Sequence, residues 1–107
     1  MRFPLIVILL ACVSSAYAQG ALPGDPAGRG HALAVEFCAA CHAIGRSGAS
    51  PNASAPPFRA LGDKIELDDF ARRLVRGLSS THPDMPTFRF KPEDAQAVAT
   101  YLLSIQK

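Results

Sequence analysis

Apolar side chains recur at helical spacing near the end of the chain. Four of them share one face of a helix: Val98, Tyr101, Leu102 and Ile105. Pro92 suits the first position of a helix, and the acidic Glu93 and Asp94 suit its positively polarised first turn. The pattern therefore predicts a helix from Pro92 to Lys107.

A second apolar stripe lies in the middle of the chain. Its members are spaced three or four residues apart: Leu67, Phe70, Leu74 and Leu78. Gly77, with two serines after Leu78, ends the pattern. On the opposite side, Asp68 precedes Arg72 by four residues. Asp69 precedes Arg73 by the same interval, and this spacing favours ion pairs along a helix.

The first expected helix begins within a segment rich in glycine and proline, residues 19 to 30. Asp25 suits the cap position before a helix, and Pro26 suits its first residue. We expect this helix to extend from Pro26 to Ala40 and to run into the sequence "EFCAACHAIG" at residues 36 to 45.

Two segments between the expected helices lack any periodicity. Residues 45 to 57 are dense in glycine, proline, serine and asparagine, and residues 81 to 92 hold three prolines. No strand pattern of any length and no internal repeat is present. The sequence therefore predicts one all-α domain, with three to four helices and long ordered loops.

The start of the chain has the features of a secretory signal peptide. Arg2 precedes an apolar run at residues 4 to 13, and the small residues "AYA" follow, ending at Ala18. The apolar run is too short to cross a bilayer. We expect cleavage after Ala18 and export of residues 19 to 107. Lipidation of Cys12, within "LLAC", is an alternative.

Composition narrows the classes of function. The chain has 107 residues, 11 Lys and Arg against 9 Asp and Glu, and no tryptophan. This near-balance gives no case for nucleic acid, which would call for a clustered basic face. A chain of this size buries a modest core and commonly needs a disulfide, a metal or another staple. The composition therefore indicates a non-protein component.

Cys38 and Cys41 stand three residues apart, and His42 follows directly. A zinc site needs a second pair of ligands, and after signal cleavage only the separate His31 and His82 remain. A thioredoxin-type dithiol follows a strand in a βαβ setting, whereas this pair lies near the end of an expected helix that no strand precedes. A disulfide across two residues closes a loop too small to stabilise much.

Covalent haem attachment remains, and it accounts for both cysteines and the histidine of a C-x-x-C-H motif. The thiols of Cys38 and Cys41 can add to the two vinyl groups of a porphyrin. The imidazole of His42 then lies against the ring and can bind the iron. We expect one covalently bound haem c.

With this motif in place, the chain resembles the class I c-type cytochromes, small exported bacterial electron carriers with a single haem. The resemblance spans residues 28 to 105 and rests on "GHALAVEFCAACH", "APPF", "HPDMPTF" and "PEDAQAVATYLLSIQ", in that order. It implies helices wrapped around the haem, with the first helix crossing the last at a glycine. Gly30 matches that glycine, and Tyr101 matches the aromatic residue it meets. Ala34 departs from the bulky aromatic that many relatives carry.

The resemblance also implies the second axial ligand of the iron. Met85, beside Pro86, matches the family's methionine ligand. Its thioether favours ferrous iron and raises the reduction potential above that of a site with two histidines. His82 competes from three residues away, but Pro83 stiffens the chain beside it.

Three further residues are assigned to the surroundings of the haem. By resemblance, the carbonyl of Pro56 accepts a hydrogen bond from the second nitrogen of His42 and so fixes the ring. Phe58 and Phe88 are candidates for packing against the haem. Both are equally compatible with an ordinary core position.

The implied function is one-electron transfer in the bacterial periplasm, with no enzymatic reaction and no small-molecule substrate. The expected partners are redox proteins: a periplasmic dehydrogenase, or a membrane oxidase or reductase. Arg72, Arg73 and Arg76 form a basic side that is either a solvated face or a docking site for an acidic partner. We expect a monomer or a small subunit of a redox complex.

Two alternatives stay open. The first is a haem c subunit that accepts electrons from one specific periplasmic dehydrogenase. The second is a haem enzyme or gas sensor with an open iron position. Two features count against the second: the haem motif lies near the mature N-terminus, and the chain has only one such motif.

Overall fold

The computed structural model describes residues 25 to 107, so the expected signal peptide and Cys12 lie outside the described residues. The elements follow in the order α1 (Pro26–Phe37), η1 (Phe58–Asp63), η2 (Leu67–Asp69), α2 (Phe70–Arg76) and α3 (Pro92–Ser104), where η marks a 3-10 helix. Within residues 25 to 107 the only β-pairing is an isolated antiparallel bridge between Leu78 and Phe88. The predicted all-α fold is confirmed. No helix in this range is long and apolar enough to cross a membrane.

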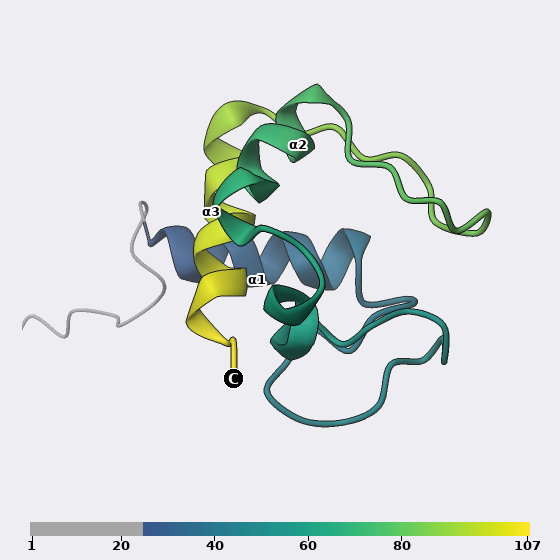
Figure 1. The fold of residues 1–107 in the computed structure, drawn as a ribbon. Coiled ribbons are helices and arrows are strands. Elements are labelled where there is room, and N and C mark those ends of the chain that lie inside the picture. Colours follow the sequence, from purple (N-terminus) through teal and green to yellow (C-terminus); the bar gives the residue numbers. More distant parts are fainter. Residues whose placement is uncertain (1–24) are drawn as a thin grey trace, which may run out of the picture.

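The α1 and α3 helices cross, and Gly30 lies at the crossing (Figure 1). A β-carbon at Gly30 would overlap the carbonyl oxygen of Ala97 and lie 2.8 Å from the Cβ of Tyr101. Glycine is needed here because it lets the two backbones approach each other. The predicted meeting of Gly30 with Tyr101 is confirmed. An ion pair from Arg29 Nε to Asp94 Oδ1, 2.7 Å long, also joins the two helices.

The core lies between α3 and the elements packed against it. Its buried side chains come from all three α-helices, from η1 and from the ends of α2 and α3: Leu33, Ala34, Phe58, Leu61, Phe70, Leu74, Leu78, Ala95, Ala97, Val98, Ala99, Leu102 and Ile105. Alanines on α3 leave room for α1 and α2 to lie close to it. Ala34 is fully buried, so the small residue at this position is part of the packed core.

The first helix is shorter than the sequence pattern predicts. The pattern extends it to Ala40, but α1 ends at Phe37. The carbonyl of Ala34 accepts hydrogen bonds from the N–H groups of both Cys38 and Ala39, each 2.9 Å long. The second of these bonds spans five residues, so the α-helical register is lost at this point. The cysteine motif therefore lies on the turn after α1 and not within the helix.

The middle helix also differs from its prediction. The pattern favours one helix over residues 67 to 78, whereas the structure has the 3-10 turn η2 followed by the short α2. Gly77, with a φ of 119°, ends α2 in a conformation that side-chain-bearing residues rarely adopt. Leu78 therefore lies beyond the helix, where it is buried and pairs with Phe88.

The predicted ion pairs Asp68–Arg72 and Asp69–Arg73 are wrong. Asp69 Oδ1 instead lies 2.7 Å from Arg72 Nε and 3.9 Å from Arg76 Nη2. Asp69 precedes the first residue of α2, so its side chain lines up with a residue three positions on. The hydrogen bond from Arg72 lowers the pKa of the Asp69 carboxyl below its usual range.

The last helix begins at Pro92, as predicted, but ends at Ser104 and not at Lys107. The Gln106 side chain explains this end. Its Nε2 donates to the Leu102 carbonyl at 2.9 Å and to the Phe58 carbonyl at 2.7 Å. The chain leaves the helix in order to make these bonds, and they hold the end of α3 against η1.

Candidate cofactor site

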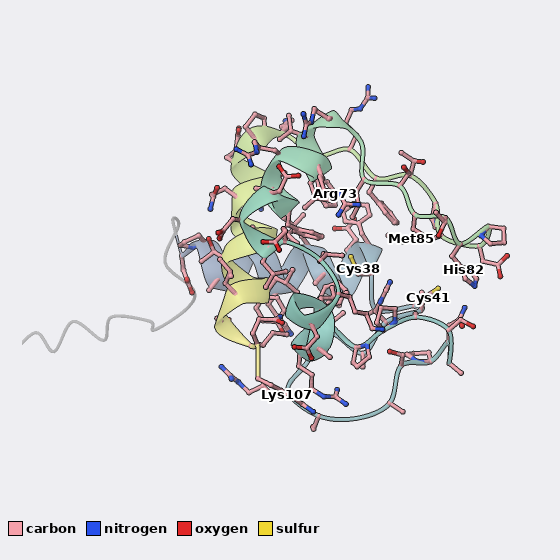
Figure 2. All side chains as sticks on the ribbon, in the orientation of Figure 1. Cys38, Cys41, Arg73, His82, Met85 and Lys107 are labelled. Atoms are coloured by element: carbon pink, nitrogen blue, oxygen red, sulfur yellow. The ribbon has the colours of Figure 1, made fainter. Side chains whose placement is uncertain are left out.

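A cavity of about 350 Å³ opens between the cysteine turn, η1, α2 and the proline-rich loop after α2. Its walls bring together all seven site residues expected from the sequence: Cys38, Cys41, His42, Pro56, Phe58, Met85 and Phe88. In Figure 2, the labelled Cys38, Cys41 and Met85 surround this space, and His82 lies farther out on the loop. The remaining walls are mostly apolar side chains from the core. The cavity can therefore take a large, flat, mainly apolar group.

The two cysteines lie on the turn that follows α1. Cys38 is the residue directly after the helix, and the N–H groups of Cys41 and His42 both bond to its carbonyl, at 3.3 Å and 3.0 Å. Both thiols are free and half-buried. Burial raises the pKa of Cys38 to about 11. A redox dithiol needs a lowered thiol pKa, so this turn does not suit one.

The imidazole of His42 is held by one hydrogen bond. Its Nδ1 lies 2.7 Å from the carbonyl oxygen of Pro56. Because a carbonyl can only accept, Nδ1 must carry the proton and donate it. In the neutral ring, Nε2 is then the nitrogen with a free lone pair, the form that binds a metal. The contact fixes both the tautomer and the orientation of a potential iron ligand.

The loop at residues 45 to 57 folds back onto the cysteine turn. The N–H of Asn52 donates to the Cys41 carbonyl at 3.0 Å, and the N–H of Phe58 donates to the Ala43 carbonyl at 2.8 Å. The N–H of Ala43 donates to Ser50 Oγ at 3.0 Å. These bonds place Pro56 beside His42, although the two residues are far apart in sequence.

Met85 approaches the same cavity from the proline-rich loop. It is half-buried, and its N–H donates to the carbonyl of His82 at 3.2 Å. The loop is anchored at its base, because Leu78 and Phe88 exchange two backbone hydrogen bonds of 2.7 Å and 2.9 Å. Phe90 adds a third bond, from its N–H to the Leu74 carbonyl. Met85 therefore lies on a loop whose base is held by three backbone hydrogen bonds.

His82 also borders the cavity, but its ring is exposed and already engaged. The backbone N–H of Asp84 donates to His82 Nδ1 at 3.3 Å, and the N–H of His82 donates to Ser80 Oγ at 2.8 Å. These contacts form a local turn that keeps the imidazole near the surface. Met85, in contrast to His82, is half-buried and lines the cavity.

The two phenylalanines hold different positions in the cavity wall. Phe58 is buried, and its ring centroid lies 5.2 Å from that of His42. Phe88 is half-buried and packs with Phe37 and Phe90, at centroid distances of 6.3 Å and 6.4 Å. Phe58 thus lies next to the imidazole, while Phe88 belongs to an aromatic cluster with Phe37 and Phe90.

Sequence reasoning missed two contributors to the site. Arg73 is half-buried and lines the cavity, although the pattern placed it with Arg72 and Arg76 on one basic side. Its position three residues after Phe70 and next to Leu74 was a signal that it borders the buried face. The second contributor is Tyr101, whose hydroxyl donates to the Ile44 carbonyl at 2.6 Å. That bond ties α3 to the end of the cysteine turn.

The described residues contain no group of three or more His, Cys, Asp or Glu side chains that could hold a metal ion by themselves. Two thiols, one imidazole with a fixed tautomer and one half-buried thioether line the cavity, and its other ligand-type side chains, His82 and Asp84, are exposed. This donor set suits a porphyrin, which brings four nitrogen ligands of its own and needs only axial partners. The residues present therefore fit a covalently attached haem.

Comparison with known proteins supports the same cofactor. The family described as Cytochrome c matches residues 27 to 106. The chain is 32% identical over 101 residues to cytochrome c-552 of Bradyrhizobium diazoefficiens, a stretch that covers 94% of this chain and 92% of the relative. No solved structure matches the chain significantly.

Proposed function

Because the chain belongs to the cytochrome c family, whose members carry electrons with covalently bound haem c, we propose that it is a periplasmic one-electron carrier with His42 and Met85 as axial ligands. One observation carries the ligand assignment. His42 Nδ1 is occupied by the Pro56 carbonyl, at 2.7 Å, and Met85 lines the same cavity from the opposite loop.

The bound haem supplies an iron that cycles between the ferric and ferrous states. The residues of this chain hold the haem and set its environment. Cys38 and Cys41 are the two thiols available for thioether bonds, and they lie within one turn of the chain. With the haem in place, the apolar lining would leave little room for water, which would strengthen electrostatic interactions inside the cavity.

The Pro56 carbonyl makes His42 a better and more rigid ligand. A donated hydrogen bond from Nδ1 increases the basicity of Nε2 and prevents the ring from rotating. Because the acceptor is a backbone carbonyl within a proline pair, it cannot itself change its protonation. A ligand held in one orientation would change little between the two oxidation states, which would favour rapid electron transfer.

Met85 is proposed as the second axial ligand and His82 as a loop residue. A thioether is neutral and soft, and it favours ferrous iron relative to a second imidazole. His82 Nδ1 already accepts the N–H of Asp84, and its ring is exposed. For His82 to reach the iron, the turn from Ser80 to Asp84 would have to open.

The periplasmic location is supported by the first residues of the sequence. Arg2, the apolar run that follows it and the "AYA" triplet have the order of a cleavable signal, with the cut expected after Ala18. Covalent haem attachment to thiols also suits a compartment outside the cytosol. Lipidation at Cys12 is the minor alternative for how the chain is held there.

Redox proteins are the proposed partners, either a periplasmic dehydrogenase or a membrane oxidase or reductase. A free carrier would shuttle between two of them. A subunit dedicated to one dehydrogenase would use the same cavity but stay bound. An enzyme or gas sensor would need an open iron position, which Met85 ligation removes, so we propose that the chain is not an enzyme.

Redox titration of the purified holoprotein tests this function. We expect one reversible transition that involves a single electron, followed through the visible absorption bands of the haem. Carbon monoxide added to the ferrous protein should leave its spectrum unchanged, because both axial positions are filled. A ready carbon monoxide complex would contradict the carrier and favour the open iron site. Copurification of a larger subunit at constant stoichiometry would favour the dedicated subunit.

A further inference from the structure

The α2 helix lies against α3 (Figure 1), and a shallow groove runs between them, apart from the cofactor cavity. The groove has a volume of about 350 Å³, and residues of α2 and of the first part of α3 line it: Ala71, Arg72, Val75, Arg76, Pro92 and Gln96. None of these residues lines the cofactor cavity. The groove is therefore a second hollow, which the proposed haem does not fill.

The two hollows lie on opposite sides of α2. Phe70, Arg73 and Leu74 line the cofactor cavity. Arg72 and Val75 line the groove instead. An α-helix turns by about 100° per residue, so these two sets of side chains point in nearly opposite directions. A segment bound in the groove would therefore lie on the far side of α2 from the haem.

Basic side chains surround the groove. Arg72 and Arg76 line it and expose 72% and 71% of their side chains. Arg89 reaches the same end of α2, because its Nη2 donates to the Arg76 carbonyl at 3.2 Å. Lys91 directly precedes Pro92, a residue of the groove, and is exposed. Four cations therefore lie in the groove or next to it, and the charged side chains that line it are both arginines.

Nearby carboxylates balance only part of this charge. Asp69 is shared by the two groove arginines, whose nitrogens lie 2.7 Å and 3.9 Å from its Oδ1. Arg89 and Lys91 form no ion pair in the part of the chain that the structure describes. Two further acidic residues, Asp68 and Glu93, are close in sequence and exposed. Against four cations these three carboxylates leave an excess of positive charge.

Between the arginines the groove is apolar. Val75 exposes 36% of its surface, and Ala71 and Pro92 line the groove with it. An apolar side chain from another molecule would remove this surface from water. A carboxylate beside that side chain would reach a guanidinium of the groove, which can bind it through two parallel hydrogen bonds. The groove thus matches an apolar residue with acidic neighbours.

We propose that this groove docks an acidic segment of a protein redox partner. An apolar side chain of the segment occupies the groove, and its flanking carboxylates bind Arg72 and Arg76. The contact holds the partner on the side of α2 away from the haem, so it leaves the cofactor cavity unobstructed. That the docked protein is a redox partner rests on the function proposed above.

A protein segment fits the groove better than a membrane does. Amphipathic surfaces that bind lipid present apolar side chains that project from a basic face. Val75 instead lines a hollow, and the carboxylate of Asp69 lies beside the arginines, where it would repel lipid phosphates. A concave, partly neutralised site suits a single projecting side chain.

The test uses a short blocked peptide that carries one central leucine flanked by glutamates. It is titrated into the reduced holoprotein labelled with nitrogen-15, and the backbone amide signals are followed by NMR at low and at physiological salt. Peptides with serine for the leucine, or glutamine for the glutamates, are controls. Arg72→Gln with Arg76→Gln and Val75→Ser change the groove. Arg46→Gln with Lys107→Gln is the matched control, since it removes two exposed charges elsewhere.

We expect the peptide to shift amide signals of the groove residues and to bind more weakly at higher salt. The double arginine variant should weaken binding about tenfold, and its matched control by less than about twofold. Val75→Ser and both control peptides should also bind more weakly. Each of these results would support the groove as a docking site.

Three results would overturn the proposal: no binding, shifts gathered around the cofactor cavity, or equal losses in the two double variants. Shifts of the groove amides by anionic lipid vesicles but not by the peptide would identify a membrane contact instead. Shifts that change on dilution of the protein alone would identify a second copy of the chain. A chain that binds the peptide in the groove but undergoes no reversible one-electron transition would contradict the proposed carrier function and leave the docking site in place.

Discussion

Met85 and His82 lie three residues apart on one loop, and their surroundings predict different effects of substitution. Met85 is half-buried on the cavity wall, whereas the His82 ring is exposed and accepts the N–H of Asp84. Met85→Ala should abolish the weak red absorption band of ferric iron bound to thioether sulfur. It should also lower the reduction potential and admit carbon monoxide or cyanide. His82→Ala should do none of this at neutral pH.

Absorption spectra of the two ferric variants, recorded with and without cyanide, decide between the ligands. Loss of the native spectrum in His82→Ala, with retention in Met85→Ala, would show that the axial pair is two histidines. The potential would then have to be explained by an imidazole in place of the thioether.

Local spacing in the sequence is enough to suggest a role for some residues. Cys38, Cys41 and His42 are adjacent or nearly so, and their arrangement needs no tertiary information. Pro56 was placed by resemblance to a family, and the observed contact with His42 has the expected partners. Arg73 could not be assigned, because its direction depends on how α2 is rotated about its own axis. That rotation is set by the packing of Phe70 and Leu74.

At the scale of the elements, the crossing of α1 and α3 depends on the missing side chain of Gly30. A β-carbon there would overlap the Ala97 carbonyl, which belongs to a helix backbone and cannot move aside. Gly30→Ala should therefore reduce the free energy of unfolding by about 3 kcal/mol, the upper part of the usual range for overpacking. Denaturant unfolding of the holoproteins, followed by circular dichroism, measures this change.

Gly45→Ala is the matched control for this substitution, because a β-carbon at Gly45 meets no atom within 4 Å. Its stability should lie within about 0.5 kcal/mol of the wild type. Equal stability of the two variants would show that the helices can separate slightly without loss, and that the close approach at Gly30 is not required.

The ion pair between Arg29 and Asp94 gives the same crossing a dependence on pH. The hydrogen bond from Arg29 is the main cause that lowers the pKa of Asp94 below its usual value of 3.8, and the charges of Arg29 and Lys91 add to it. A carboxyl with a lowered folded pKa stabilises the fold above its unfolded pKa and loses this contribution as the pH falls through the folded one. The contribution should therefore be complete at neutral pH and disappear below pH 3.8.

Stability curves of wild type and Asp94→Asn, measured from about pH 6 to about pH 2, test this dependence. The variant should be less stable at neutral pH and should lose less stability on acidification. Asp63→Asn, at an exposed carboxylate outside the ion pairs of residues 25 to 107, serves as the control and should follow the wild type. Parallel curves for wild type and Asp94→Asn would contradict a stabilising role for this contact, whose exposure to solvent limits its strength.

Element types followed from periodicity, but element ends did not. The apolar stripes identify α2 and α3, because burial of one face repeats along each helix, and Asp25 and Pro26 identify the start of α1. Their ends are decided by bonds to distant residues, such as the Gln106 side chain on the Phe58 carbonyl. The 3-10 helix at Phe58–Asp63 was missed for a related reason. It is too short to show a period, and its first residue is held by the Ala43 carbonyl.

At the scale of the whole molecule, the stability of the fold depends on what fills the cavity. The core between α1, α2 and α3 lies to one side, and the cysteine turn and the proline-rich loop after α2 extend to the other (Figure 1). Residues of both segments line the cavity. Several core side chains, among them Phe58, Leu74 and Val98, also line the cavity. Without the haem these side chains would face water. The mature chain should therefore be largely unfolded when it has no cofactor.

The double variant Cys38→Ser and Cys41→Ser tests this dependence, since it removes both attachment points and changes little else. Circular dichroism of the purified mature variant should show low helix content and no cooperative melt. A fully helical variant with a sharp transition would mean that the core alone sustains the fold. The share of stability that we assign to the haem would then be too large.

The most direct measurement is the haem content of the denatured wild-type chain. Purified protein is run on a denaturing gel and stained for the peroxidase activity of haem, with the cysteine double variant beside it, and the intact mass of each chain is recorded. The account predicts a stained wild-type band, a mass increased by one haem, and an unstained variant at the mass of the bare chain. A wild-type band that carries no stain and no added mass would contradict covalent attachment at Cys38 and Cys41.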